Sequence, residues 1–195
     1  MVLRVCLDVN VWIAYLLALQ HSRVGTAPMR LVAMVQACAA GTIPLQLMVS
    51  QEMLGTLERV LKRQGLPDHL AEGFPHAVEG LMQVGPEKLQ PALLTAGRDQ
   101  LAMTDREDAG VLAFCMADRV DLLVTDNLSD FVTNDSERRD TQRVSRRDGT
   151  TRQLSVLIHE RLDGVSLAVA HPIDAVLWLA AGFRPIPASL RLRYP

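Results

Sequence analysis

The stretch TDREDAGVLAFCMADRVDLLVTDNLSDF, residues 104–131, governs how the rest of this chain is interpreted. Its first half predicts a helix, because Asp108, Leu112 and Cys115 recur at the spacing of one helical stripe. The apolar run at 122–124 then predicts a short strand that is buried on both faces. Polar residues follow this strand at once, namely Thr125, Asp126, Asn127 and Asp130. The stretch therefore joins an apolar helix headed by an acid to a buried strand that ends in more acid.

Length and composition narrow the class of protein. The chain has 195 residues, 49% of them hydrophobic, so it can bury a sizeable core and most simply forms one domain. A formal net charge of −2 argues against nucleic-acid binding through an overall positive field, so any such binding must be local. Neither a membrane-spanning run nor a signal-peptide pattern is found, and Cys6, Cys38 and Cys115 show no CxxC pairing. We expect a cytoplasmic protein with reduced thiols.

In the first half of the chain, strands and helices are expected to alternate. The predicted elements are a strand at 2–7 that ends at Asp8, helices at 11–20 and 29–40, a strand at 43–49, and a helix from the cap Ser50 to about residue 63. Between 64 and 98 the four prolines predict broken helices or loops, and no element is assigned there.

The second half continues the alternation after an arginine-rich interruption. Thr104 and Glu107 form a capping-box pattern for the next helix. The further expected elements are a strand at 120–125, an arginine-rich hairpin within 134–161 that turns at 146–149, a strand at 165–169, and a helix from Pro172 to Gly182. The prediction is an α/β domain over 1–182 with a mostly parallel sheet flanked by helices. The hairpin would be an insertion, and 183–195 a C-terminal tail.

The predicted topology brings acids together. Ligands of open parallel sheets bind outside the carboxyl ends of the strands, where Asp8 and Asp126 both lie, and Asp108 would enter from its helix. Clustered carboxylates repel one another, and a hard cation with oxygen ligands is the usual remedy. Mg²⁺ or Mn²⁺ could then orient a phosphate and generate hydroxide from bound water. These residues indicate a nuclease-like site.

Each acid also has a purely structural interpretation. Asp8 could be a turn former at the end of a strand, and Asp126, Asn127 and Asp130 could be ordinary loop residues. Acids such as Asp108 and Glu52 are favourable in the first turn of a helix in any case.

Several segments in sequence order resemble the PIN-domain family of metal-dependent ribonucleases. VLRVCLDVNVWIAYLL resembles the opening strand with its DxN signature, and VSQEMLGTLERVLKR resembles the helix that usually supplies a Glu. EDAGVLAFCMADRVDLLVTDNLSDF resembles the helix with the third acid and the strand that ends in a Thr-x-Asn/Asp loop. VSLAVAHPIDAVLWLAAG resembles the closing strand and helix. The resemblance thus spans most of the chain.

The resemblance assigns roles to particular residues. It places the first metal-binding Asp at Asp8, its small polar partner at Asn10 and the third acid at Asp108. Two positions depart from the family pattern. This chain has Thr56 where the resemblance places the helix Glu, and Glu52, one turn earlier, could substitute for it. It has Asn127 where the resemblance places the loop acid. Many members are toxin subunits, which implies an RNA substrate, an antitoxin protein as partner and a homodimer.

The leading hypothesis is a divalent-metal-dependent endoribonuclease. Its predicted catalytic residues are Asp8, Asp108 and Asp126, its predicted metal ligands add Asp130 and Glu52, and its supporting residues are Asn10, Thr56, Thr125 and Asn127. Local arginines would hold the RNA, above all Arg146 and Arg147, with Arg138, Arg139, Arg143 and Arg152 as further candidates. One alternative is a PIN-like binding module with a weakened site. Another is a phosphotransferase of the haloacid-dehalogenase type, in which Asp8 would be the nucleophile.

Overall fold

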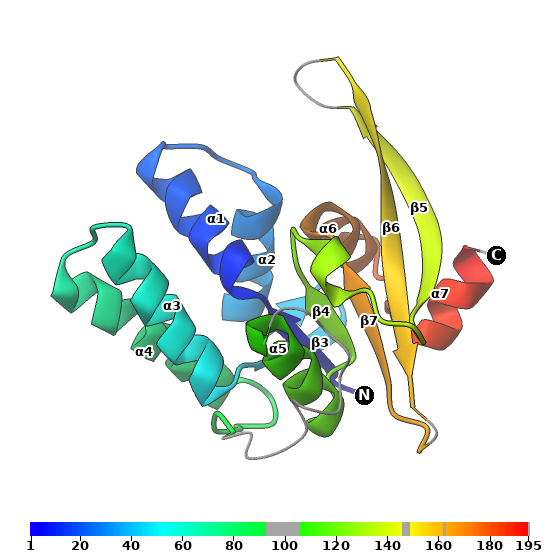
Figure 1. Cartoon of the computed structure of the whole chain (residues 1–195), viewed down its shortest axis with the longest axis horizontal. Helices are drawn as coiled ribbons and strands as arrows, with labels where there is room; N and C mark the ends of the chain where they lie inside the picture. The colour runs from blue at the N-terminus through cyan, green and yellow to red at the C-terminus, as the bar shows by residue number, and fades with distance from the viewer. Residues whose placement is uncertain (93–105, 146–148, 162, 195) are drawn as a thin grey trace.

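The computed structural model describes residues 1–92, 106–145, 149–161 and 163–194 (Figure 1). In this part of the chain the elements are β1 (Leu3–Leu7), α1 (Val9–Gln20), α2 (Ala27–Gln36), β2 (Ala39–Ala40), β3 (Ile43–Met48), α3 (Gln51–Arg63), α4 (Asp68–Val84), α5 (Arg106–Ala117), β4 (Leu122–Val124), the 3-10 helix η2 (Leu128–Phe131), β5 (Glu137–Ser145), β6 (Thr151–Glu160), β7 (Ser166–Ala170), α6 (Pro172–Ala180) and α7 (Pro187–Arg193).

The strands of the described chain form one seven-stranded sheet in the order β2-β3-β1-β4-β7-β6-β5. Its centre is parallel, because β1 pairs with β3 and β4, and β4 pairs with β7. The strands β2, β6 and β5 are antiparallel to their neighbours. All three residues of β4 are buried, as expected for a central strand with helices on both faces. The predicted α/β fold with a mostly parallel sheet is thus confirmed.

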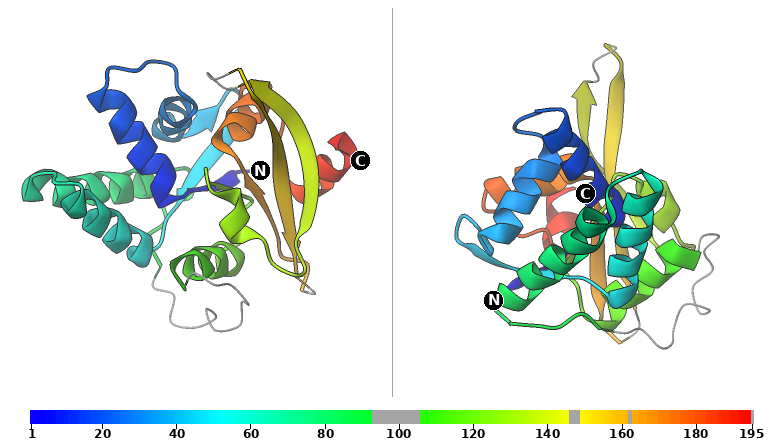
Figure 2. Two further views of the ribbon diagram at one scale, coloured as in Figure 1. Left: turned by 45° about the horizontal axis from the view of Figure 1, so that its top comes forward. Right: turned by 90° about the vertical axis from the view of Figure 1, so that its left-hand side faces the viewer.

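Helices cover both faces of this sheet (Figures 1 and 2). The helix α5 lies on one face, whereas α2 and α6 contact each other on the opposite face. The helix α3 packs against α4 and also contacts α1. Among the described residues, no helix is both long and apolar enough to cross a membrane.

The proline-rich segment after α3 folds differently from the prediction. It contains α4, a continuous helix of 17 residues that runs through Pro75. A proline inside a helix removes one backbone hydrogen bond and costs about 3 kcal/mol. In α4 the residues Ala71, Pro75, Val78 and Met82 form a buried stripe at helical spacing. The prediction of broken structure was wrong here because burial of this stripe offsets the cost of the proline.

Two other segments differ from the prediction. The helix expected at 29–40 ends at Gln36, because Cys38 adopts a positive φ of 51° and the chain then pairs as β2 with β3. The unassigned tail contains α7, whose Leu190 is fully buried. Burial of Pro187 and Leu190 thus accompanies helix formation in a segment with little periodicity of its own.

The strands β5 and β6 pair antiparallel, and β6 joins the sheet through β7. Both reach beyond the other strands (Figure 1). The register shifts between Asp140 and Arg143, where the side chains of Thr141 and Gln142 donate hydrogen bonds to the buried carboxylate of Asp174 in α6. The expected turn at Arg146 and Arg147 lies outside the described residues. That the segment 134–161 is an insertion stays a prediction.

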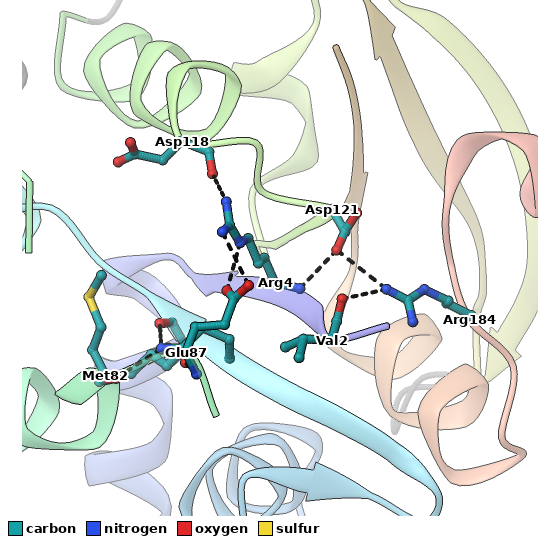
Figure 3. Close-up of polar contacts among 9 residues, drawn as sticks. Val2, Arg4, Met82, Glu87, Asp118, Asp121 and Arg184 are labelled. Carbon is teal, nitrogen blue, oxygen red and sulfur yellow. Dashed lines mark hydrogen bonds and ion pairs between the residues drawn. The ribbon is translucent and has the colours of Figure 1, made fainter. Parts of the chain in front are cut away.

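The amino ends of the central strands are held by a network around Arg4 (Figure 3). The Arg4 guanidinium donates to the Glu87 carboxylate at 2.7 Å and to the carbonyl oxygen of Asp118 at 2.9 Å, while its backbone N–H donates to Asp121 at 2.8 Å. Arg184 also lies 3.8 Å from the Asp121 carboxylate. This edge of the sheet is opposite to the carboxyl ends, where the predicted site residues lie.

Candidate metal centre

Three adjacent parallel strands end in a polar residue at the same edge. Asp8 directly follows β1, Thr125 follows β4 and His171 follows β7. The N–H of Asp8 donates to the carbonyl oxygen of Val124 at 3.0 Å. The N–H of Thr125 donates to the carbonyl oxygen of Ala170 at 3.0 Å. These bonds continue the strand pairing past the sheet, so the three residues lie next to one another along this edge, as the parallel topology predicts.

The carboxylate of Asp8 is held in a fixed orientation. Its Oδ2 accepts hydrogen bonds from the Thr125 hydroxyl at 2.8 Å and from the Asn10 amide at 2.7 Å. Its Oδ1 accepts one from the backbone N–H of Val9 at 2.7 Å, which caps the N-terminus of α1. Asp8 thus serves as a helix cap and as a member of the site, and its predicted partners Asn10 and Thr125 lie against it.

Burial is the largest influence on Asp8 and raises the pKa of its carboxyl group. The negative charge of Asp130 raises this pKa further, whereas the hydrogen bonds from Thr125 and Val9 lower it. A cation bound beside Asp8 would favour the charged carboxylate and relieve the repulsion from Asp130. The electrostatics of the site are therefore those of an acidic pocket that gains from a positive ion.

A cavity of about 730 Å³ opens beside Asp8. The carboxylates that line it are Asp8, Glu52, Glu107, Asp108 and Asp130, and the further polar residues on its wall include Asn10, Thr56, Arg59 and Asn127. We name this space the acidic cavity. It brings together residues from α1, α3, α5 and the loop after β4, which the sequence places far apart. Of the predicted catalytic residues, Asp8 and Asp108 lie on its wall.

The acidic cavity has the donor chemistry of a site for a hard divalent cation, because carboxylate oxygens predominate. In the described part of the chain, no group of three or more His, Cys, Asp and Glu residues is arranged to hold a metal ion. Mg²⁺ is commonly bound through one or two carboxylates, with waters and substrate phosphates as the remaining ligands. Asp8 and Asp108 each contribute a carboxylate to the wall of the acidic cavity.

The hydroxyl of Thr56, where the resemblance places the helix Glu, accepts a hydrogen bond from Arg59 at 2.8 Å. The same guanidinium lies 3.0 Å from the Glu107 carboxylate, with both side chains more than half exposed. Glu52, one turn before Thr56, also lines the acidic cavity. The helix α3 therefore presents both a carboxylate and a cation to the acidic cavity.

The loop after β4 directs its two acids to different places. The carboxylate of Asp126 lies 2.8 Å from Nε2 of His171, and this hydrogen bond is the main cause that lowers the pKa of Asp126. Asp130 instead lines the acidic cavity together with Asn127, whose amide donates to it. The structure thus places Asp130 on the wall of the acidic cavity, whereas Asp126 contacts a histidine.

Sequence reasoning missed His171 and Arg59. His171 directly follows β7, so the rule that drew attention to Asp8 and Asp126 applies to it equally. Arg59 lies one helical turn after Thr56 on α3, a spacing that places both on one side of the helix. The predicted RNA contacts Arg146 and Arg147 lie outside the described residues.

A family model described as PIN domain matches residues 4–129. The matched segment runs from β1 into η2 and so contains Asp8, Asp108 and Asn127, while Asp130 follows it directly. No curated protein matches the chain. No solved structure matches it either.

Proposed function

Because this chain belongs to the PIN-domain family, we propose that it is a divalent-metal-dependent endoribonuclease that hydrolyses RNA phosphodiester bonds. PIN domains are typically nucleases that use divalent metal ions. The observation that supports the proposal most is that Asp8, from the end of β1, and Asp108, from the first turn of α5, line one acidic cavity. This pair combines the family's first and third acids with a cavity that is open to a substrate.

In the proposed mechanism Asp8 and Asp108 hold Mg²⁺ or Mn²⁺. The ion would supply hydroxide from bound water and neutralise charge on the phosphate. The Thr125 hydroxyl and the Asn10 amide keep Asp8 oriented through their bonds of 2.8 and 2.7 Å. The oxygen of the Asn10 side chain also accepts from the backbone N–H of Asp126 at 3.2 Å, so it positions the start of the loop.

We assign the next carboxylate of the site to Asp130, because it lines the acidic cavity and its charge acts on Asp8. Glu52 is a further proposed ligand from α3. For Asp126, whose Oδ1 lies 2.8 Å from Nε2 of His171, we propose that it positions the loop.

The family resemblance also leads to a proposal for the biological role of the chain. We propose a toxin-like component of a toxin–antitoxin pair, with a small antitoxin protein as partner and a homodimer as the assembled form. Expression of the chain alone should slow growth, and co-expression with the protein encoded next to it should restore growth. Unaffected growth with a catalytically active chain would contradict the toxin role alone.

A second candidate function is a PIN-like RNA- or protein-binding module with weakened catalysis. The contact between Thr56 and Arg59 favours it, because the position of the usual Glu holds a hydroxyl that is bound to a cation. A cation at this place repels a metal ion. The two candidates differ in whether the chain binds Mn²⁺ and cleaves RNA.

Cleavage of an unstructured RNA, with and without Mn²⁺, tests the proposed function. We expect cleavage by the wild type only with the metal, and a loss of at least 100-fold in Asp108→Asn, beyond the roughly 10–100-fold typical of groups that only support ligands. Asp118→Asn is the matched control, because Asp118 directly follows the same helix at the opposite edge of the sheet. Metal-dependent cleavage that survives in Asp108→Asn would remove this residue from the mechanism.

A further inference from the structure

Another cavity, of about 160 Å³, is lined in part by the loop after β4. Its wall includes Asn127, Ser129, Arg138, Arg152, Ser155 and His171. Asn127 lines the acidic cavity as well, so the two spaces share one residue of this loop. None of the described residues on this wall is acidic. We name this space the basic cavity.

The two arginines of the basic cavity have charge available for a ligand. Nε of Arg138 donates to the Ser155 hydroxyl at 3.1 Å, a neutral partner. The charge of Arg152 reaches the loop, since it lowers the pKa of Asp126. By contrast, Arg139 on the same strand is paired with Glu137. In the described chain no ion pair with a carboxylate is formed by Arg138 or Arg152.

The two arginines of the basic cavity lie on strands that are held in place by pairing and by a contact with α6. Arg138 lies on β5 and Arg152 on β6, and the two strands pair along their length. The strand β5 is tied to α6 where Thr141 donates to the fully buried Asp174 at 2.7 Å. Both strands lie beyond residue 129, where the match to the family model ends. The two arginines thus lie outside the segment that the family model matches.

We propose that the basic cavity binds a backbone phosphate of the RNA strand, next to the phosphate that is cleaved in the acidic cavity. This inference rests on the proposed function and deepens it by naming a substrate subsite. Arginine binds phosphate through two parallel N–H donors, and Arg138 and Arg152 present such groups on one wall. Ligand pockets for whole small molecules measure roughly 300–1,000 Å³. The smaller basic cavity suits a phosphate with part of its sugar.

The contrast between the two cavities gives the RNA strand a defined path. The carboxylates of the acidic cavity repel a phosphate until a cation is present. The arginines of the basic cavity attract a phosphate with or without the metal. RNA binding through this subsite therefore persists when the metal is chelated, whereas cleavage stops.

Fluorescence anisotropy with a labelled, unstructured RNA oligonucleotide tests the subsite, on the whole chain in EDTA between 50 and 200 mM salt. Each phosphate contact to a single strand contributes about 0.7 to the slope of log K against log salt. We expect the double variant Arg138→Gln/Arg152→Gln to bind at least tenfold more weakly, with a slope smaller by about 0.7 for the one phosphate contact that is lost. Arg161→Gln, past the end of β6 and paired with Asp163, should match the wild type.

Arg152→Gln alone guards against a folding artefact, because no side-chain hydrogen bond of Arg152 is formed within the described chain, whereas its backbone pairing with β5 is unchanged by the substitution. It should weaken binding and lower the slope by no more than about 0.7. Affinities and slopes equal to those of Arg161→Gln would overturn the subsite, as would a wild type that binds no RNA in EDTA. Arginine-dependent binding without any metal-dependent cleavage would support the subsite and contradict the nuclease, so the two proposals fail separately.

Discussion

Nε2 of His171 lies 2.8 Å from the Oδ1 of Asp126, and Nδ1 of the same ring accepts the backbone N–H of Ile173 at 3.2 Å. With Nδ1 acting as the acceptor, Nε2 is the nitrogen that donates to the carboxylate. This contact joins the end of β7 to the loop after β4 and directs the first acid of that loop to the histidine. Asp130, four residues later, lines the acidic cavity instead.

This division of the loop predicts unequal effects of two matched substitutions. Asp130→Asn should raise the Mn²⁺ concentration needed for half-maximal cleavage by about 10–100-fold, because it removes a carboxylate from the acidic cavity. Asp126→Asn should raise it by less, because an amide oxygen still accepts from His171. A metal titration of the cleavage rate measures both. The reverse order of effects would place Asp126 at the ion.

The Thr125 hydroxyl joins three groups of the site. It donates to Asp8 and accepts from the Asn10 amide at 2.9 Å and from the backbone N–H of Asn127 at 3.1 Å. Thr125→Val keeps the shape but removes one hydrogen bond from the buried Asp8 carboxylate, so we expect a loss of about 1–3 kcal/mol in the free energy of unfolding. Urea denaturation measures this loss. Thr151→Val, at an exposed position of β6, should change it by less than about 0.5 kcal/mol, and equal losses would contradict the account.

Thr56 is the residue at which the sequence resemblance places the helix Glu of the family. Thr56→Glu adds a carboxylate to the acidic cavity, so we expect Mn²⁺ to bind several-fold more tightly, with a larger gain at low salt. Calorimetric titration with Mn²⁺ measures the affinity. The matched control Thr56→Gln has the same length without the charge and should show no such gain. Equal affinities in the two variants would show that this position does not face the ion.

Burial raises the pKa of Asp174 in α6, although hydrogen bonds from Thr141 and Gln142 lower it in part. Between the pKa of the unfolded chain and this raised value, the folded protein keeps a proton that the unfolded chain has lost. The free energy of unfolding therefore falls as pH rises through this window. Asp174→Asn does not titrate, so its stability relative to the wild type should increase with pH there. Urea denaturation across pH measures the difference, and a constant difference would contradict it.

The parallel core and the acidic edge could be predicted because both are local signals. Apolar runs such as 122–124 predict buried strands, and an acid directly after the run, as at Asp8, then lies at the carboxyl edge. The helix α4 could not be predicted in this way, because the proline penalty is local whereas burial of Ala71 and Met82 is a property of the folded chain.

The direction of each loop carboxylate was also beyond sequence reasoning. Asp126 faces His171, which comes from a different strand, and no local pattern links the two. The basic cavity was likewise not marked by any local sequence pattern. Arg138 and Arg152 were included among several arginines by composition, and only the pairing of β5 and β6 beside Asn127 distinguishes them from Arg139.

The central claim is that the carboxylates at the edge of the sheet hold a divalent ion. Diffraction from crystals soaked in Mn²⁺ tests it most directly, because anomalous scattering locates the metal and its ligands. The account predicts one anomalous peak in the acidic cavity, within bonding distance of Asp8 and Asp108, and its loss in crystals of Asp8→Asn. A wild-type crystal with no peak beside Asp8 at saturating Mn²⁺ would contradict the account.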